Sequence, residues 1–167
     1  MIDYLIKLPK KIKYFIGFLF CCALMIYVFY AQYVLNLEPC PLCIFQRLAV
    51  IAMGIIFLCC SIIEPKTKIT TLLASFFYTL AASAGIAVAS RHIWLQNLPS
   101  DQVPGCGPGL DFMLSTFPLA EVLEMVFSGS GECANVDWSF LSLSMPAWVI
   151  ISLSVMLIYA IWINYRG

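Results

Sequence analysis

The chain enters its second long apolar run through the stretch EPCPLCIFQR, residues 38–47. Cys40 and Cys43 are separated by two residues, and Arg47 follows four residues after Cys43. If the chain is helical from Ile44 onward, Cys43 and Arg47 lie on one face of the helix. A guanidinium that stays charged, beside a cysteine near a helix N-terminus, favours the thiolate over the thiol. The stretch therefore predicts the start of a helix that carries a reactive sulfur.

The composition around this stretch is that of an integral membrane protein. Of the 167 residues, 62% are hydrophobic and 11% are charged, and the mean hydropathy is +0.94, which is too apolar for an ordinary soluble domain. A helix needs about 20 apolar residues to cross a hydrocarbon core about 30 Å thick. Runs that reach about this length cover residues 14–35, 44–63, 71–89 and 146–163. We expect one all-α membrane domain over residues 1–167, an antiparallel bundle of four transmembrane helices.

The positive charges predict how this bundle is oriented, because Lys and Arg beside membrane spans are retained in the cytoplasm. The flanking charges are Lys7, Lys10, Lys11, Lys13, Lys66, Lys68 and Arg166. We therefore expect both termini in the cytoplasm, with cytoplasmic residues 1–13, 64–70 and 164–167. The connections 36–43 and 95–145, the second of which lacks Lys and Arg, face outward. The first run is too long for a signal-peptide core, so we expect it to be retained. No basic surface for nucleic acid is visible.

The eight cysteines divide by their positions relative to these spans. The outward-facing set is Cys40, Cys43, Cys106 and Cys133. This side is oxidising if it is a bacterial periplasm. The other set, inside the spans, is Cys21, Cys22, Cys59 and Cys60. We expect the second set to behave as small hydrophobic residues without a chemical role.

Polar residues of the second and third spans should lie at the same membrane face, because one span runs inward and the next outward. Arg47 lies about one helical turn, roughly 5 Å, inside its span, where an unrelieved charge costs energy. His92 is the only histidine and lies at the level of Arg47. Its neighbour Arg91 is either an interfacial anchor or a functional residue. Ala81, Gly85 and Ala89 form a stripe of small residues that predicts close helix packing.

The long outer connection consists of two different parts. Residues 99–109 are rich in proline and glycine and predict an irregular, exposed segment that presents Cys106. Apolar residues then recur at i, i+3, i+4 and i+7 over residues 119–126. This spacing predicts a short amphipathic helix, which lies either on the membrane surface or on the protein core.

Two outer cysteine pairs, one tight and one on a long loop, suit the passage of disulfides by thiolate exchange. Cys106 is the better target for a partner's thiolate, and Cys133 is then its resolving partner. Electrons that reach Cys40 and Cys43 need an acceptor. No haem, flavin or iron–sulfur signature is visible, so an apolar diffusing acceptor such as a quinone is the simplest choice. Its carbonyl oxygens could accept hydrogen bonds from two residues, Arg47 and His92.

Two other kinds of site are compatible with these cysteines. The C-x-x-C pair and the two loop cysteines could form a tetrahedral zinc–thiolate site. The four cysteines could also form static, purely structural disulfides, although this leaves Arg47 unexplained. The module would then be anchored in the membrane without redox turnover.

Four motifs together resemble those of a known family over nearly the whole chain. They are PCPLC followed by QR at 39–47, RHIWLQ at 91–96, Cys106 in its loop, and SGEC at 130–133 leading through Trp138 to MPAW at 145–148. This combination is similar to the disulfide bond formation protein B (DsbB) family of bacterial inner-membrane thiol:quinone oxidoreductases. The resemblance implies a four-helix bundle that reoxidises the periplasmic dithiol oxidase DsbA and passes electrons to ubiquinone or menaquinone. The direction of electron flow comes from the resemblance alone.

The resemblance also implies a role for each site residue. Cys106 would form the mixed disulfide with DsbA, and Cys133 would be its partner, able to link transiently to Cys40. Cys43 would be the thiolate that faces the quinone. Arg47 would stabilise the negative charge, and His92 would line the quinone site.

Overall fold

The computed structural model describes residues 8–99, 101–103, 105, 110–129, 131–136 and 138–166. Cys106 lies outside these ranges, so its predicted role stays a prediction.

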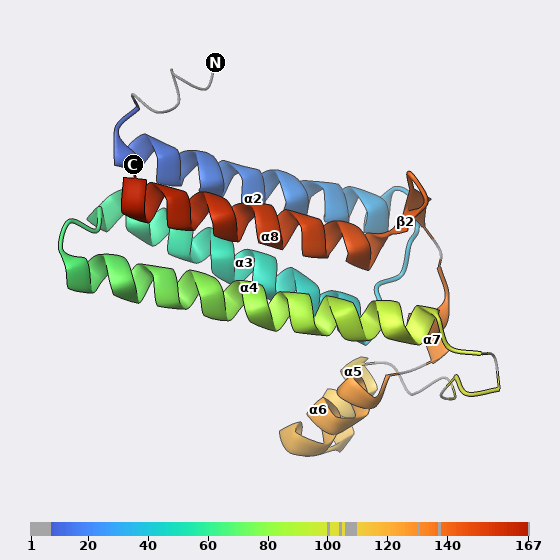
Figure 1. Ribbon diagram of the computed structural model, residues 1–167. Coiled ribbons are helices and arrows are strands. Elements are labelled where there is room, and N and C mark those ends of the chain that lie inside the picture. Colours follow the sequence, from blue (N-terminus) through green and yellow to red (C-terminus); the bar gives the residue numbers. More distant parts are fainter. Residues whose placement is uncertain are drawn as a thin grey trace.

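Four long helices form the body of the molecule and run side by side (Figure 1). They are α2 (Lys10–Tyr33), α3 (Pro41–Ile63), α4 (Lys68–Gln96) and α8 (Met145–Arg166). Each is long and apolar enough to cross a membrane, which confirms the predicted all-α membrane bundle. The helices extend beyond most of the predicted spans: the 29 residues of α4 measure about 44 Å, against a hydrocarbon core of about 30 Å. The helix α4 is therefore longer than an untilted crossing of the apolar layer requires.

Local sequence explains where these helices begin and end. Pro41 opens α3, where the amide proton that proline lacks is not needed, so this helix starts before the predicted Ile44. It ends at Ile63, and its C-cap residue Glu64, just before Pro65, has a left-handed φ of 51°. The next helix starts at a capping box: Thr67 Oγ1 accepts from the Thr70 amide at 3.2 Å, and the reverse bond measures 3.1 Å.

The helices approach closely where their residues are small. A Cβ added to Gly85 of α4 would lie 2.7 Å from the Cβ of Ala49 in α3 and 2.5 Å from Leu153 of α8. The close packing predicted for the small-residue stripe is therefore seen at Gly85. Polar bonds join three helices at the end of the bundle near the α3–α4 turn. Tyr14 of α2 donates to Asn164 of α8, which donates to the hydroxyl oxygen of Ser75 in α4 at 2.7 Å.

The opposite end of the bundle, here called the outer end, carries the start of α3 and the connection between α4 and α8 (Figure 1). This connection contains α5 (Leu110–Thr116), α6 (Leu119–Ser128) and α7 (Gly131–Ala134). It ends in a two-stranded hairpin, β1 (Ser139–Phe140) and β2 (Leu143–Ser144), with Phe140 paired to Leu143. The helix α6 confirms the predicted amphipathic helix, whereas α5, α7 and the hairpin were not predicted.

The apolar face of α6 packs on the protein. Val122 and Val126 are almost completely buried, in one cluster with Leu42 of α3 and with Val88 and Leu95 of α4. The structure thus favours the second of the two surfaces considered for this helix, the protein core.

Candidate active site

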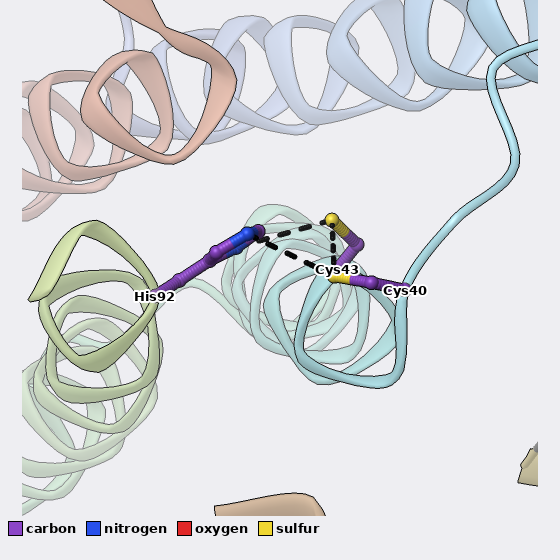
Figure 2. A group of neighbouring side chains, drawn as sticks. All are labelled: Cys40, Cys43 and His92. Carbon is purple, nitrogen blue, oxygen red and sulfur yellow. Dashed lines mark hydrogen bonds between the residues drawn. The ribbon is translucent and has the colours of Figure 1, made fainter. Parts of the chain in front are cut away.

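The two cysteines of the C-x-x-C motif meet at the first turn of α3 (Figure 2). Cys40 is the N-cap residue, and Cys43 lies three residues further along. Their sulfur atoms are 3.1 Å apart, with the Cys40 thiol donating. Because a disulfide bond measures about 2.05 Å, the sulfurs need to approach by only about 1 Å to close one. The local helix start therefore holds the pair ready for reversible oxidation.

His92 reaches this pair from the neighbouring helix α4 (Figure 2). Its Nε2 lies 3.8 Å from Cys40 Sγ and its Nδ1 lies 4.0 Å from Cys43 Sγ. The side chain is only 3% exposed. The prediction that the antiparallel spans bring His92 to the level of the cysteine motif is correct, and the structure adds direct contact with the sulfurs.

Gln46 fixes the orientation of this imidazole. Its amide nitrogen lies 3.0 Å from His92 Nδ1, and both side chains are buried. An amide NH2 group can only donate, so Nδ1 accepts and Nε2 carries the ring proton, which faces Cys40. Gln46 was not among the predicted site residues. The signal that could have found it is its position three residues after Cys43, on the same helical face.

Arg47 shares the helix α3 with Cys43, as predicted, but its direct contacts are with α2. Its guanidinium donates to the amide oxygen of Gln32 in α2 and lies 6.0 Å from the ring centre of Phe29. Among the described residues, it makes no hydrogen bond to either sulfur. The charge is instead held against α2, and hydrogen bonding relieves the cost of placing it inside a span.

A cavity of about 690 Å³ connects Arg47 to the sulfurs. Five of its polar lining residues are Gln32, Gln46, Arg47, His92 and Gln96, and both cysteines also face it. Its apolar lining includes Leu24, Met25, Val28, Ala31, Val50 and Val149. Tyr27, Trp138, Phe140 and Trp148 add aromatic surface. Glu38, Glu132, Asn135 and Ser152 also line it. The size and the mainly apolar wall are typical of a small-molecule site.

This donor set fits a quinone. A quinone is a flat apolar ring with two carbonyl acceptors, so it requires apolar walls and a small number of hydrogen-bond donors. Arg47 and His92 supply donors, and the sulfurs of the motif face the same space. The cavity thus joins the paired thiols of Cys40 and Cys43 to a space suited to an apolar ring.

Cys133 lies at the outer end, on the short helix α7. It is 1% exposed and belongs to the buried cluster that contains Cys40 and Leu95. The Gly131 amide, at the start of α7, donates to the carbonyl of Gly105 at 3.3 Å. Gly105 is the residue immediately before Cys106 in the sequence. The loop that contains Cys106 is therefore hydrogen-bonded to the start of α7 at Gly105, one residue before Cys106.

The cysteines inside the spans lie elsewhere in the bundle. Cys21 and Cys60 are buried in the cluster around Phe57, separate from the cluster of Cys40, and Cys59 is exposed on the helix surface. Cys22 is half-buried. The predicted lack of a role for these four cysteines stays a prediction.

The site also offers a set of metal ligands. One ligand atom each from Cys40, Cys43 and His92 can be chosen so that all lie within 4.8 Å of one another. Thiolates and imidazole are ligands that zinc takes. Among the described residues, the third ligand is a histidine, whereas the zinc site considered from the sequence used loop cysteines.

Known proteins resemble this chain over most of its length. The family model described as "Disulfide bond formation protein DsbB" matches residues 10–163. A protein named Disulfide bond formation protein B from Nitrosococcus oceani is 48% identical over 159 residues, which cover 93% of this chain and 92% of the relative. One of the same name from Hahella chejuensis is 48% identical over 145 residues, 87% of each chain. A third, from Methylococcus capsulatus, is 47% identical over 138 residues, 83% of this chain and 84% of the relative.

Proposed function

Because the chain belongs to the DsbB family of disulfide bond formation proteins, as its motifs predicted, we propose that it is a membrane thiol oxidase. It oxidises a periplasmic dithiol protein of the DsbA type and delivers two electrons to a membrane quinone, ubiquinone or menaquinone. The observation that carries the proposal is the paired sulfurs of Cys40 and Cys43, in contact with His92, on the wall of an apolar cavity between helices.

The first half of the cycle is an exchange between the partner and the loop cysteines. A thiolate of the partner attacks Cys106 in the Cys106–Cys133 disulfide, forms a mixed disulfide and releases Cys133 as a thiolate. The second thiol of the partner then displaces Cys106 and leaves oxidised. The partner has lost two electrons and two protons, and Cys106 and Cys133 have gained them. The bond between Gly131 and Gly105 supports this pairing, because it ties the residue before Cys106 to the helix of Cys133.

The second half transfers these electrons to the motif on α3. Cys133 as a thiolate attacks Cys40 in the Cys40–Cys43 disulfide, so that a Cys133–Cys40 bond forms and Cys43 leaves as a thiolate. Cys106 then attacks Cys133, restores the loop disulfide and leaves Cys40 reduced. The Nε2 proton of His92 faces Cys40, where it can stabilise the sulfur as negative charge develops.

Within the cavity, the residues that would hold the quinone are Arg47 and His92, with the apolar side chains of α2 and α8 around its ring. A bound quinone supplies an acceptor for two electrons and two protons, which leaves Cys40 and Cys43 as a disulfide. Arg47 is held toward the cavity by Gln32 and favours negative charge there. The side chain of Cys43 is half-buried in this wall, which limits the contact of its sulfur with water.

We place the chain in a bacterial inner membrane with both termini in the cytoplasm, so that the outer end faces the periplasm. The absence of Lys and Arg from residues 95–145 supports this orientation. A soluble dithiol partner would then meet the loop cysteines, while the quinone would enter from the lipid.

The direct test is quinone reduction by the purified protein in detergent, with a reduced DsbA-type protein as electron donor. We expect loss of quinone absorbance at a rate that depends on both substrates, and complete loss of activity in Cys43→Ser. Cys59→Ser is the matched control, because Cys59 is exposed outside the site, and it should keep full activity. Full activity of Cys43→Ser, or no turnover of the unmodified protein with either quinone, would refute the proposal.

A zinc–thiolate module is the second candidate, favoured by the spacing of Cys40, Cys43 and His92. It predicts about one zinc per chain after purification, loss of that zinc in His92→Ala, and no quinone reduction. Metal analysis by mass spectrometry together with the quinone assay separates the two functions.

A further inference from the structure

The connection between α6 and α7 is held by two residues of α4. We propose that Arg91 and Leu95 form a bracket that fixes this connection and thereby positions Cys133 for its exchange with Cys40. Arg91 is then a positioning residue, which acts on the reaction through Cys133. The inference rests on the proposed function for its catalytic consequence, but its structural content is tested separately below.

Arg91 binds the end of α6 through two hydrogen bonds. Its Nε donates to the carbonyl of Phe127 at 3.2 Å, and its Nη2 donates to the carbonyl of Ser128 at 3.3 Å. The last carbonyls of a helix have no partner within the helix and carry the negative end of its dipole. A guanidinium satisfies both requirements at once. Its plane is also held by Trp94, whose ring centre lies 4.0 Å from the guanidinium carbon.

Leu95 holds the next residue of the same connection by packing. Gly129 has a φ of 89°, and a Cβ added to it would lie 2.5 Å from a methyl group of Leu95. Leu95 is completely buried in the cluster that includes Cys40 and Cys133. Since Leu95 follows Arg91 by four residues, both point from one face of α4. The bracket therefore grips three consecutive residues, 127–129, by polar and apolar contacts together.

The position of this grip explains its consequence for the reaction. The helix α7 begins at Gly131, two residues after the bracket, and carries Cys133. The residue after Arg91 is His92, which contacts Cys40 and Cys43. The same end of α4 thus positions both the imidazole of His92 beside the cysteine motif and Cys133, which must attack Cys40 in that motif. If the grip is lost, α7 loses its hold on Arg91 and Leu95, and Cys133 can shift relative to Cys40 while the motif itself remains intact.

An interfacial anchor is the other explanation for an arginine at this height. An anchor acts on lipid headgroups, and its replacement would change the insertion or stability of the whole protein. The bracket instead predicts a local change, confined to the accessibility of Cys133 and to the exchange step that uses it. These two consequences can be measured apart.

The structural test uses the full chain with Cys40, Cys43 and Cys106 replaced by serine, so that Cys133 is the remaining outer cysteine. The rate of its alkylation by a charged, membrane-impermeant maleimide reports how often α7 opens. We expect Arg91→Met to raise this rate about tenfold, because two charge-assisted hydrogen bonds are lost. Arg91→Lys, which keeps the charge but not the fork of donors, should give a smaller increase. Asn97→Ala, which removes a side-chain hydrogen bond within the same helix end, should leave the rate unchanged.

The catalytic test uses the chain with its natural cysteines and two electron donors. With the DsbA-type partner, Arg91→Met should lower kcat about tenfold and leave the KM for quinone unchanged. With a small dithiol that reduces Cys40–Cys43 directly, the rate should stay at that of the unmodified protein, because the step from Cys133 is bypassed. Equal losses with both donors would indicate general damage and overturn the bracket.

A second variant covers the case in which Arg91→Met does not fold. Gly129→Ala pushes on Leu95 from the other side of the grip and should also speed the alkylation of Cys133. If alkylation in both variants stays within twofold of the parent, the bracket is refuted. Failure of the proposed function gives a different pattern, in which the alkylation rates change as expected but the unmodified protein reduces no quinone.

Discussion

Replacing Gln46 tests whether the orientation of His92 matters for exchange at the cysteine motif. Gln46→Met keeps the length of the side chain but removes the donor that lies 3.0 Å from His92 Nδ1. Because His92 is buried, its Nδ1 would lose its nearest partner and keep only the weaker contact with Cys43 Sγ at 4.0 Å, which costs about 1–3 kcal/mol. The imidazole can relieve this cost by moving its proton to Nδ1, but Nε2 then no longer donates toward Cys40.

The expected effect on rate follows from that cost. If about 1–2 kcal/mol of it appears in the exchange step, kcat with the DsbA-type partner falls by about five- to thirtyfold. The measurement is steady-state quinone reduction, with thermal unfolding in detergent as a check that the fold is kept. Gln102→Met is the matched control, because the Gln102 side chain is exposed and the hydrogen bond of this residue to the carbonyl of Pro99 comes from its backbone amide. An unchanged kcat in Gln46→Met would show that the tautomer of His92 does not control the reaction.

Three further changes test other parts of the structure. Arg47→Met should raise the KM for quinone about tenfold or more, because it removes a charged hydrogen-bond donor from the cavity wall. The rate at which a mixed disulfide forms with the partner, followed on non-reducing gels, should stay the same. Gly85→Ala should lower the free energy of unfolding by about 1–3 kcal/mol, because its new methyl group meets α3 and α8. Denaturation in mixed micelles measures this change, and an unchanged stability would argue against the close approach of the three helices. Asn164→Leu should lower the same free energy by about 1–3 kcal/mol, because it breaks the hydrogen bonds that join α2, α8 and α4, and quinone reduction by the surviving folded protein should persist.

The four long helices could be predicted because their signals are local. Hydropathy over about 20 residues, Pro41 at a first helical turn and Glu64-Pro65 at a helix end each act through the residues next to them. The same holds for α6, whose apolar repeat was recognised without knowing what it packs against. The β1–β2 hairpin was missed because its turn uses Leu141 and Ser142 at positive φ, where Asn or Gly is the usual signal.

The proximity of His92 to the cysteine motif also followed from sequence, because antiparallel neighbouring spans bring fixed positions to one height. Height along the membrane is set by counting residues. The rotation of each helix about its own axis cannot be obtained by counting residues, and this rotation decides which side chains touch. Gln46 contacts His92, and Arg47 turns to Gln32 in α2, only because α3 packs in one particular rotation between its neighbours.

The sequence by itself therefore determined the membrane class, the number of long helices and the level at which the cysteine motif and His92 meet. The tertiary structure decided that a cavity joins Arg47 to the sulfurs, that α6 buries Val122 and Val126 in the protein, and that Arg91 binds the end of that helix. The physical reason is the sequence separation over which each interaction acts. Hydropathy and helix caps act within a few residues of the chain, whereas these contacts join residues more than 30 positions apart in several cases and depend on how whole helices pack.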